Sequence, residues 1–362
     1  MSIQEIRVIK SESVGQKPRP KSDGELGFGK YFTDHFFLMD YEKEEGWFNA
    51  RIEPYGPIPL DPSAMVLHYG QGIFEGLKAY RMANGGISLF RPYKNIERMN
   101  RSALRMCMPE VDSSLFFQAM KELILLDQEW IPTSSGTALY IRPTMIATEA
   151  ALGLKASSRY LFYIIIGPVG PYYPEGFNPT RIYVTKKYVR AARGGVGEAK
   201  TSGNYAASLY ATTQAQKKGF TQVLWLDALE HKYCEEIGTS NIFFLVNDEL
   251  ITPPLSGSIL PGITRDSVIY VAKDWGLKVV ERQISIDEVM RGCKDGSMKE
   301  VFATGTAAII SPVGEICYQD QNIRIGDGRT GPLSKKFYDE ITGIQYGLKE
   351  DPYGWCIRLD QT

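Results

Sequence analysis

Cysteine is scarce in this chain and follows no pattern. Its five cysteines, spread over 362 residues, are odd in number and never spaced as CxxC. Disulfide frameworks and zinc sites need paired or clustered thiols, so we expect neither, and no metal site is predicted. Free thiols suit a reducing compartment, which predicts a cytoplasmic protein.

Long apolar runs and an excess of one charge are also missing. The opening, MSIQEIRVIK, holds no apolar signal-peptide core, and no uncharged apolar run reaches the roughly 18 residues of a membrane-spanning helix. Lysine and arginine number 41 against 42 aspartates and glutamates, and the two signs are mixed along the sequence. We therefore expect no membrane or nucleic-acid partner.

What is present describes a globular protein of two domains. The composition is 43% apolar and 23% charged, and the length exceeds the roughly 250–300 residues at which single cores usually split. The stretch 168–180 holds four prolines and is the predicted linker. It separates a domain at 31–167, preceded by an arm at 1–30, from a domain at 181–362. Helical and strand-like segments are mixed in the first half, which indicates an α+β class.

Turn and cap residues locate several elements. HFFLMDY and WFNARIEPYG indicate a hairpin, and the Asn-Gly-Gly sequence at 84–86 supplies the positive-φ residues of a second tight hairpin turn. Asp112 is the predicted N-cap of the helix that follows it. Gly219 and Gly276 are predicted to end two later helices.

The most informative segment is GGVGEAKTSGNYAAS, residues 194–208. Lys200 stands among glycines and small residues, directly before a predicted helix. Small neighbours let a large planar group approach the backbone closely. A lysine amine that loses its proton in a desolvated or cation-rich pocket becomes a nucleophile toward carbonyls. On spacing alone, a solvated lysine in a flexible loop is the alternative.

Two later segments could bind an anion. In SILPGITRDSVI, at 258–269, the first amides of a predicted helix belong to Ile263 and Thr264, and such amides lack intrahelical partners. In ATGTAAI, at 303–309, a small-residue turn could present the Thr306 hydroxyl and successive amides. Taken singly, a plain helix start and a tight turn are the alternatives.

A carboxylate precedes a buried-looking strand in EEIGTSN. A pyridine-type cofactor acts as an electron sink only while its ring nitrogen stays protonated, and a buried carboxylate maintains that state. Glu235 and Glu236 are both available, and the residues alone do not choose between them. A surface acidic pair is the alternative. The order of these segments along one chain is more distinctive than any of them alone.

Together, LHYGQGIFEGLKAYR, GGVGEAKTSGNYAAS, EEIGTSN, LPGITRDS and TGTAAIISPVG closely resemble the branched-chain aminotransferases, which are fold type IV pyridoxal-phosphate enzymes. The motifs occur in the family's order, and the match runs from about residue 30 to the C-terminus. The resemblance implies the two-domain, D-amino-acid aminotransferase-like α+β fold. Its N-terminal α/β domain would be the smaller one, and its larger, β-rich C-terminal domain would bind the cofactor.

The resemblance also implies cofactor roles at matching positions. Lys200 resembles the Schiff-base lysine and proton shuttle, Tyr205 the tyrosine on the ring hydroxyl, and Glu236 the carboxylate on the pyridine nitrogen. The residues implied to bind the phosphate are Arg98, Arg190, Ile263, Thr264 and Thr306. Without the family, Arg98 would be interpreted as a solvated side chain on an exposed helix face.

Substrate roles follow in the same way. The residues implied to wall an apolar side-chain pocket are Phe74, Tyr69, Tyr140 and Tyr172. Arg142, in YIRP, resembles the arginine that meets the distal carboxylate of glutamate, and Thr306 and Ala307 resemble the turn that binds the α-carboxylate. Tyrosines have an apolar face and a polar tip, which suits both kinds of substrate. Tyr173 competes with Tyr172 for its role.

The implied activity is transamination of L-leucine, L-isoleucine and L-valine with 2-oxoglutarate, by a ping-pong mechanism with pyridoxal 5'-phosphate. The family also implies a homodimer whose site lies near the subunit interface, with Tyr69 donated by the partner. One alternative is another enzyme of this fold type, a D-amino-acid aminotransferase or an aminodeoxychorismate lyase. A second is a non-catalytic ligand-binding protein, although no GxxxxGKS or GxxxxGKT run is present and the glycines of GGVG do not match the nucleotide-binding GxGxxG pattern.

Overall fold

The computed structural model describes residues 5–10, 18–172 and 177–359. The chain divides into two compact units. Unit 1 comprises Met1–Tyr172, Ala199–Ser202 and Gly343–Thr362, and unit 2 comprises Tyr173–Glu198 and Gly203–Thr342. Helices and strands are mixed in both units, which confirms the α+β class.

Two stretches depart from the expected division. The sequence predicts that 199–202 and 343–362 belong to the C-terminal domain, but both belong to unit 1. The resemblance implied a smaller N-terminal domain. With these additions, unit 1 is not the smaller of the two units. The predicted arm also contributes to the interior, since the side chains of Ile6 and Leu26 are buried.

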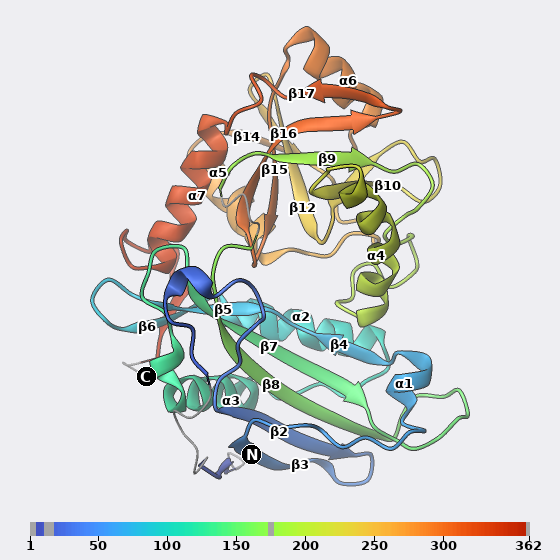
Figure 1. Cartoon of the computed structure of the whole chain (residues 1–362). Helices are drawn as coiled ribbons and strands as arrows, with labels where there is room; N and C mark the ends of the chain where they lie inside the picture. Colours follow the sequence, from blue (N-terminus) through green and yellow to red (C-terminus); the bar gives the residue numbers. More distant parts are fainter. Residues whose placement is uncertain (1–4, 11–17, 173–176, 360–362) are drawn as a thin grey trace. The chain divides into compact units, whose positions relative to one another are not determined.

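Unit 1 is built on one mixed sheet, drawn mainly in blue and green in Figure 1. Among the described residues the sheet has nine strands, in the order β1-β3-β2-β8-β7-β5-β6-β18, and β4 pairs with β7. The strands are β1 Arg7–Val8, β2 His35–Glu42, β3 Gly46–Pro54, β4 Gly72–Phe74, β5 Leu77–Arg81, β6 Ile87–Phe90, β7 Ala138–Ala147, β8 Arg159–Val169 and β18 Cys356–Arg358. Strand β18 brings the C-terminal stretch into this sheet beside β6.

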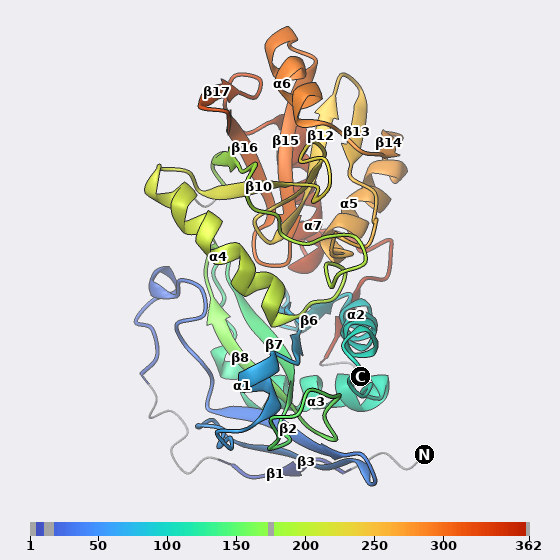
Figure 2. The same ribbon diagram turned by 90° about the vertical axis from the view of Figure 1, so that its right-hand side faces the viewer.

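Two helices, α2 (Pro92–Arg105) and α3 (Ser113–Leu126), lie on the same side of this sheet (Figure 2). Their apolar residues, such as Met99 and Phe116, share one buried cluster with strand residues such as Phe37. This packing fixes α2, which carries Arg98, against the sheet. The remaining short helices of unit 1 are η1 Asp23–Glu25, α1 Met65–Tyr69 and η2 Gln128–Trp130.

The locally encoded elements of unit 1 are confirmed. Strands β2 and β3 form the predicted antiparallel hairpin. The β5–β6 turn contains Gly85 with a φ of 84°, a conformation that glycine adopts without steric cost. Asp112 caps α3, since its carboxylate accepts hydrogen bonds from the backbone N–H groups of Ser114 and Leu115, each at 3.0 Å.

Unit 2 is built on a second sheet, which also has nine strands within the described ranges. Its order is β11-β10-β9-β16-β15-β12-β13-β14, with β17 beside β16, and β11 also pairs with β12. That extra pairing closes the strands β11, β10, β9, β16, β15 and β12 into a ring. The strands are β9 Thr180–Val184, β10 Gln222–Leu226, β11 Cys234–Ile237, β12 Ser240–Val246, β13 Glu249–Thr252, β14 Lys278–Glu281, β15 Met298–Gly305, β16 Ile309–Tyr318 and β17 Gln321–Arg324.

Within the described residues, four helices have most of their residues in unit 2. They are α4 Ser202–Lys217, α5 Ile263–Asp274, α6 Ile286–Asp295 and α7 Pro332–Gln345. Gly219 and Gly276 lie just past the ends of α4 and α5 with φ values of 82° and 74°, as the sequence predicts. These assignments put the small-residue stretch after Arg190 directly before α4.

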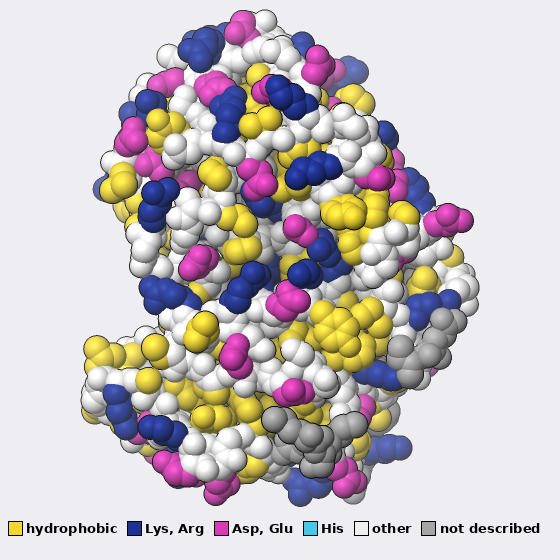
Figure 3. Space-filling model, turned by 180° about the vertical axis from the view of Figure 1, so that it is seen from behind, with side chains coloured by type: hydrophobic (Ala, Val, Ile, Leu, Met, Phe, Trp, Pro, Cys, Tyr) yellow, Lys and Arg dark blue, Asp and Glu magenta, His cyan; other side chains and the backbone are white. Residues whose placement is uncertain are grey.

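The surface carries charges of both signs. Lysine and arginine side chains alternate with aspartate and glutamate over the face seen in Figure 3. No helix within the described residues is long and apolar enough to span a bilayer.

Candidate active site

The backbone of Lys200 is fixed by neighbouring elements of unit 1. Its carbonyl accepts a hydrogen bond from Phe74 N at 3.0 Å, and its N–H donates to the Ser102 hydroxyl at 2.9 Å. The next residue, Thr201, donates from its hydroxyl to Gly72 O at 2.8 Å. Strand β4 and helix α2 therefore hold the lysine in place, although the bonded residues Lys200 and Ser102 are 98 positions apart and Thr201 and Gly72 are 129 positions apart.

The Lys200 amine lies against an aromatic ring. Its Nζ is 5.1 Å from the centroid of the Phe74 ring. Burial lowers the pKa of Lys200 to about 8, the charge of Arg98 acts in the same direction, and Glu75 opposes them. An amine with this pKa is partly neutral near pH 7–8, and the neutral form is the one that attacks carbonyls.

Glu75 and Arg98 form a buried ion pair beside this lysine. Arg98 donates from Nε to Glu75 Oε1 at 2.7 Å and from an Nη to Oε2 at 2.9 Å, and Asn95, one helical turn earlier, donates to Oε2 at 2.8 Å. Burial raises the pKa of the Glu75 carboxyl, but the charges of Arg98 and Lys200 and these hydrogen bonds hold it below its usual range. The sequence did not reveal Glu75 or Asn95 as site residues.

An arginine and several aromatic rings gather near the same strands. The Arg142 guanidinium lies 4.7 Å from the Phe74 ring centroid, and its Nη donates to the Tyr140 hydroxyl at 3.1 Å. The Phe28 ring packs edge-on against both Tyr140 and Tyr172, with centroids 4.9 and 5.1 Å apart. Predicted pocket residues from β4, β7 and the segment after β8 thus lie together. Tyr173, the competitor of Tyr172, lies outside the described residues.

Tyr69 lies elsewhere in unit 1. It ends the short helix α1, and its hydroxyl donates to the backbone carbonyl of Leu152. The side chain is 40% exposed, and Leu67, two residues earlier, and Leu152, which accepts the hydrogen bond, are also exposed, as is Leu154. Tyr69 is therefore positioned at a surface, in contrast to Tyr140 and Phe74.

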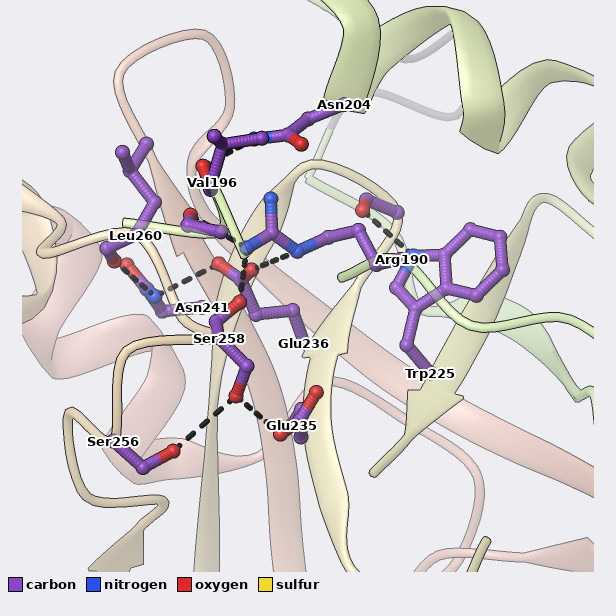
Figure 4. A network of polar contacts seen from close by, with 12 residues as sticks. Arg190, Val196, Asn204, Trp225, Glu235, Glu236, Asn241, Ser256, Ser258 and Leu260 are labelled. Carbon is purple, nitrogen blue, oxygen red and sulfur yellow. Dashed lines mark hydrogen bonds and ion pairs between the residues drawn. The ribbon is translucent and has the colours of Figure 1, made fainter. Parts of the chain in front are cut away.

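In unit 2, Glu236 lies at the centre of a buried polar network (Figure 4). Its carboxylate forms an ion pair with Arg190 and accepts a hydrogen bond from Asn241 Nδ2 at 3.0 Å. Asn241 also donates to Leu260 O at 2.9 Å, which ties the network to the loop before α5. Only 2% of Glu236 and 8% of Arg190 are exposed, so each charge depends on the other for compensation.

The neighbouring Glu235 has a different partner. Its Oε1 accepts a hydrogen bond from the Ser258 hydroxyl at 2.5 Å, and burial raises the pKa of its carboxyl despite that bond. The two carboxyls, between which the residues alone did not choose and the resemblance favoured Glu236, are thus in different electrostatic environments. Glu236 faces a cation, whereas Glu235 faces a neutral hydroxyl.

Two further predicted anion-binding segments have the expected local form. Ile263 and Thr264 are the first residues of α5, so their N–H groups lie at the helix N-terminus. Thr306 and Ala307 lie in the tight turn that joins β15 to β16. Tyr205 is half-buried in the first turns of α4.

Comparison with known proteins identifies the family of this chain. The family model for class IV amino-transferases matches residues 72–316. Branched-chain-amino-acid aminotransferase 2 of Bacillus subtilis strain 168 is 53% identical over 359 residues, which is 99% of this chain and 98% of that protein.

Solved structures show the same fold. The crystal structure of Escherichia coli branched-chain amino acid aminotransferase superposes with a TM-score of 0.75 at 27% identity, covering 90% of this chain and 99% of that one. The T.th. branched-chain amino acid aminotransferase complexed with N-(5'-phosphopyridoxyl)-L-glutamate gives 0.71 at 26% identity, covering 89% and 98%. The chain therefore belongs to the class IV aminotransferases and, within them, to the branched-chain-amino-acid aminotransferases.

Proposed function

We propose that the protein transfers amino groups between the branched-chain L-amino acids leucine, isoleucine and valine and 2-oxoglutarate, with pyridoxal 5'-phosphate as cofactor. The observation that carries the proposal is the Lys200 amine, whose pKa is lowered to about 8 beside the Phe74 ring. That amine suits covalent attachment to an aldehyde. The coexistence of its protonated and neutral forms also suits proton transfer near neutral pH.

Residues of this chain fit the cofactor. Lys200 would carry it, Glu236 would hold the ring nitrogen protonated, and Tyr205 would bond the ring hydroxyl. The residues proposed for the phosphate are Arg98, Ile263, Thr264 and Thr306, whereas Arg190, implied there by the resemblance, forms an ion pair with Glu236. A phosphate suits helix-terminal amides and arginines because both offer directed N–H donors. When bound, the cofactor supplies an electron sink for the carbanion formed at the substrate Cα.

The proposed catalytic work of the protein is proton transfer and electrostatics. Lys200, once displaced by the incoming amino group, would take the proton from the substrate Cα. It would then donate a proton to the former aldehyde carbon of the cofactor. Glu236, paired with Arg190, stays ionised and keeps the ring proton in place. Because amino donor and amino acceptor use the same site in turn, ping-pong kinetics follow.

The substrate roles are proposed from the aromatic group around Arg142. Phe74, Tyr140 and Tyr172 would surround an aliphatic side chain, and Thr306 and Ala307 would donate to the α-carboxylate. Arg142 would bind the distal carboxylate of glutamate or 2-oxoglutarate, because a guanidinium offers two parallel donors to a carboxylate. A single pocket would then accept an apolar and an anionic side chain alternately.

A steady-state assay tests this function. Purified protein should transfer the amino groups of L-leucine, L-isoleucine and L-valine to 2-oxoglutarate, with parallel lines in double-reciprocal plots. The three rates should differ modestly, since one methylene is worth about 1–3 kcal/mol in an apolar pocket. D-leucine and L-aspartate are the matched controls, and a preference for either would refute the substrate class.

We also propose a cytoplasmic homodimer. Tyr69, Leu67, Leu152 and Leu154 form an exposed apolar surface that a second copy would cover, with Tyr69 reaching the partner's substrate. The five free thiols suit the reducing cytoplasm. Light scattering should give twice the 40.6 kDa chain mass for the protein, and L154D should shift it toward monomer. A monomeric, fully active protein would contradict the dimer.

A further inference from the structure

The strand that carries the two glutamates contains a bulge. Trp225 on β10 pairs with Glu236, and the next residue, Leu226, pairs with Cys234, so Glu235 is an extra residue on β11. A bulge re-aims side chains that would otherwise alternate strictly between the two faces of a sheet. Glu235 therefore contacts the loop that contains Ser258 directly, and Glu236 is connected to that loop through Arg190 and Asn241.

Arg190 is held from two sides by neutral carbonyls. An Nη group donates to Gly197 O at 2.9 Å and also to Ser258 O, while Nε forms the ion pair with Glu236 (Figure 4). Backbone carbonyls orient a guanidinium without cancelling its charge, so Glu236 is the anion in contact with it. The fixed fork of the guanidinium then dictates where the Glu236 carboxylate lies.

Ser258 links Arg190 to the second glutamate. Its carbonyl accepts from Arg190, and its hydroxyl donates to Glu235 Oε1. Ser256 adds a hydroxyl contact to Ser258 at 3.2 Å. Within the described residues, Glu235 Oε2 has no hydrogen-bond partner, which favours a neutral carboxyl in a site where only 8% of the residue is exposed.

Gly197 permits this close assembly. A Cβ at position 197 would collide with the backbone of Ser258, including the carbonyl that Arg190 binds. Any larger residue must push the two carbonyl-bearing segments apart. The glycine is thus required by the Arg190 site itself, in addition to its place in the small-residue stretch before Lys200.

We propose that Arg190, Ser258 and Glu235 are positioning residues that keep Glu236 ionised and oriented toward the cofactor's ring nitrogen. The inference rests on the proposed function and reassigns Arg190 from the phosphate to this carboxylate. A buried carboxylate without its cation takes up a proton and can no longer stabilise a protonated ring. A second anion beside it would have the same effect, so Glu235 must remain neutral while it anchors Ser258.

The test measures the ring nitrogen rather than turnover. The protein is loaded with ¹⁵N-ring-labelled pyridoxal phosphate, and the nitrogen chemical shift, which reports its protonation, is followed between pH 6 and 9 by NMR. The wild-type nitrogen should stay protonated throughout. In R190Q it should lose its proton within this range, and in R190K it should behave in between, because lysine keeps the charge without the fork.

Matched variants separate this role from a general loss of charge or structure. Arg193 is exposed three residues away, so R193Q removes the same charge and should leave the ring nitrogen protonated. In E235A the ring nitrogen should lose its proton at a lower pH than in wild type. In E235Q, whose neutral side chain still accepts from Ser258, the ring nitrogen should stay protonated as in wild type. G197A should resemble R190K. Circular dichroism identifies any variant that does not fold, and the remaining variants then decide.

The outcomes distinguish the inference from the function on which it rests. Wild-type protein that binds no pyridoxal phosphate, or binds it without transaminating L-leucine, overturns the proposed function. Active wild type with a protonated ring, together with an R190Q ring that is equally protonated, overturns the inference alone. An E235Q variant that behaves like E235A overturns the neutral state of Glu235.

Discussion

Arg98 and Glu75 are joined by two parallel hydrogen bonds, of 2.7 and 2.9 Å, in a place where the arginine is 4% exposed and the glutamate 0%. The pair lies beside Lys200, and its two charges act on the lysine in opposite directions. Arg98 lowers the pKa of the amine, and Glu75 raises it. This relationship connects the stability of unit 1 to the reactivity of its lysine.

Replacing Glu75 by glutamine should destabilise the apoprotein by about 3–5 kcal/mol, because Arg98 is left buried without its anion. Urea unfolding followed by fluorescence measures the loss. Added cofactor should recover part of it if its phosphate takes the place of the carboxylate. The control is E97Q on the same helix, whose exposed pair with Lys94 should contribute less than about 1 kcal/mol. Equal losses in the two variants would contradict the buried pair's role.

The reactivity of Lys200 should depend on pH in a defined direction. Its lowered pKa means that the amine releases its proton at lower pH than usual, so its labelling by an acylating reagent should rise through about pH 8 and then level off. In the unfolded chain the labelling of the same lysine should continue to rise until the pH approaches the ordinary lysine pKa of ~10.4. Mass spectrometry of the Lys200 peptide from apoprotein measures both curves. Coincident curves would show that the folded environment does not act on the amine.

Arg142 should separate the two substrate types. R142M keeps much of the side-chain bulk but removes the charge, so the KM for 2-oxoglutarate should rise at least about tenfold, as expected for loss of a buried charge partner. The rate of the half-reaction with L-leucine alone should change far less. The control, R159Q on the neighbouring strand, removes an exposed arginine paired with Glu42 and should change neither. A parallel loss for both substrates in R142M would indicate a structural role only.

Glu300 should stabilise the start of α7. Its carboxylate accepts from Leu333 N and Ser334 N, each at 2.8 Å, and from the Ser334 hydroxyl at 2.7 Å. E300Q places an amide donor against these donors and should cost about 1.5–3 kcal/mol in urea unfolding. The surface pair of Arg181 and Glu315 offers the comparison, and E315Q should cost no more than about 1 kcal/mol.

The sequence predicted what is encoded locally. The cap at Asp112, the turn at Gly85 and the helix end at Gly219 depend on residues within four positions of each other, so their signals are visible in one segment. The pairing of the segment around Lys200 with β4 joins residues more than 100 positions apart, and no local pattern announces it. For the same reason the C-terminal strand β18 was not placed beside β6.

The candidate site shows the same limit. The motifs identified Lys200 and offered Glu235 and Glu236 as alternatives, but the bulge that gives the two carboxyls different partners comes from pairing with β10. Without the family resemblance, the helix face that Arg98 shares with Arg101 and Arg105 indicates an exposed side chain, whereas Arg98 is buried and paired with Glu75. The FEG triplet before β5 was the available signal, since a carboxylate between apolar residues seldom stays buried without a cation.

A single-turnover experiment tests whether Lys200 carries out the amino transfer. Cofactor-loaded protein is mixed with L-leucine and no oxo acid, and the 2-oxo acid released is quantified against bound cofactor. Wild type should release one equivalent per site, accompanied by loss of the yellow colour, and K200A should release none on the same timescale. Near-normal release by K200A would contradict this role of Lys200.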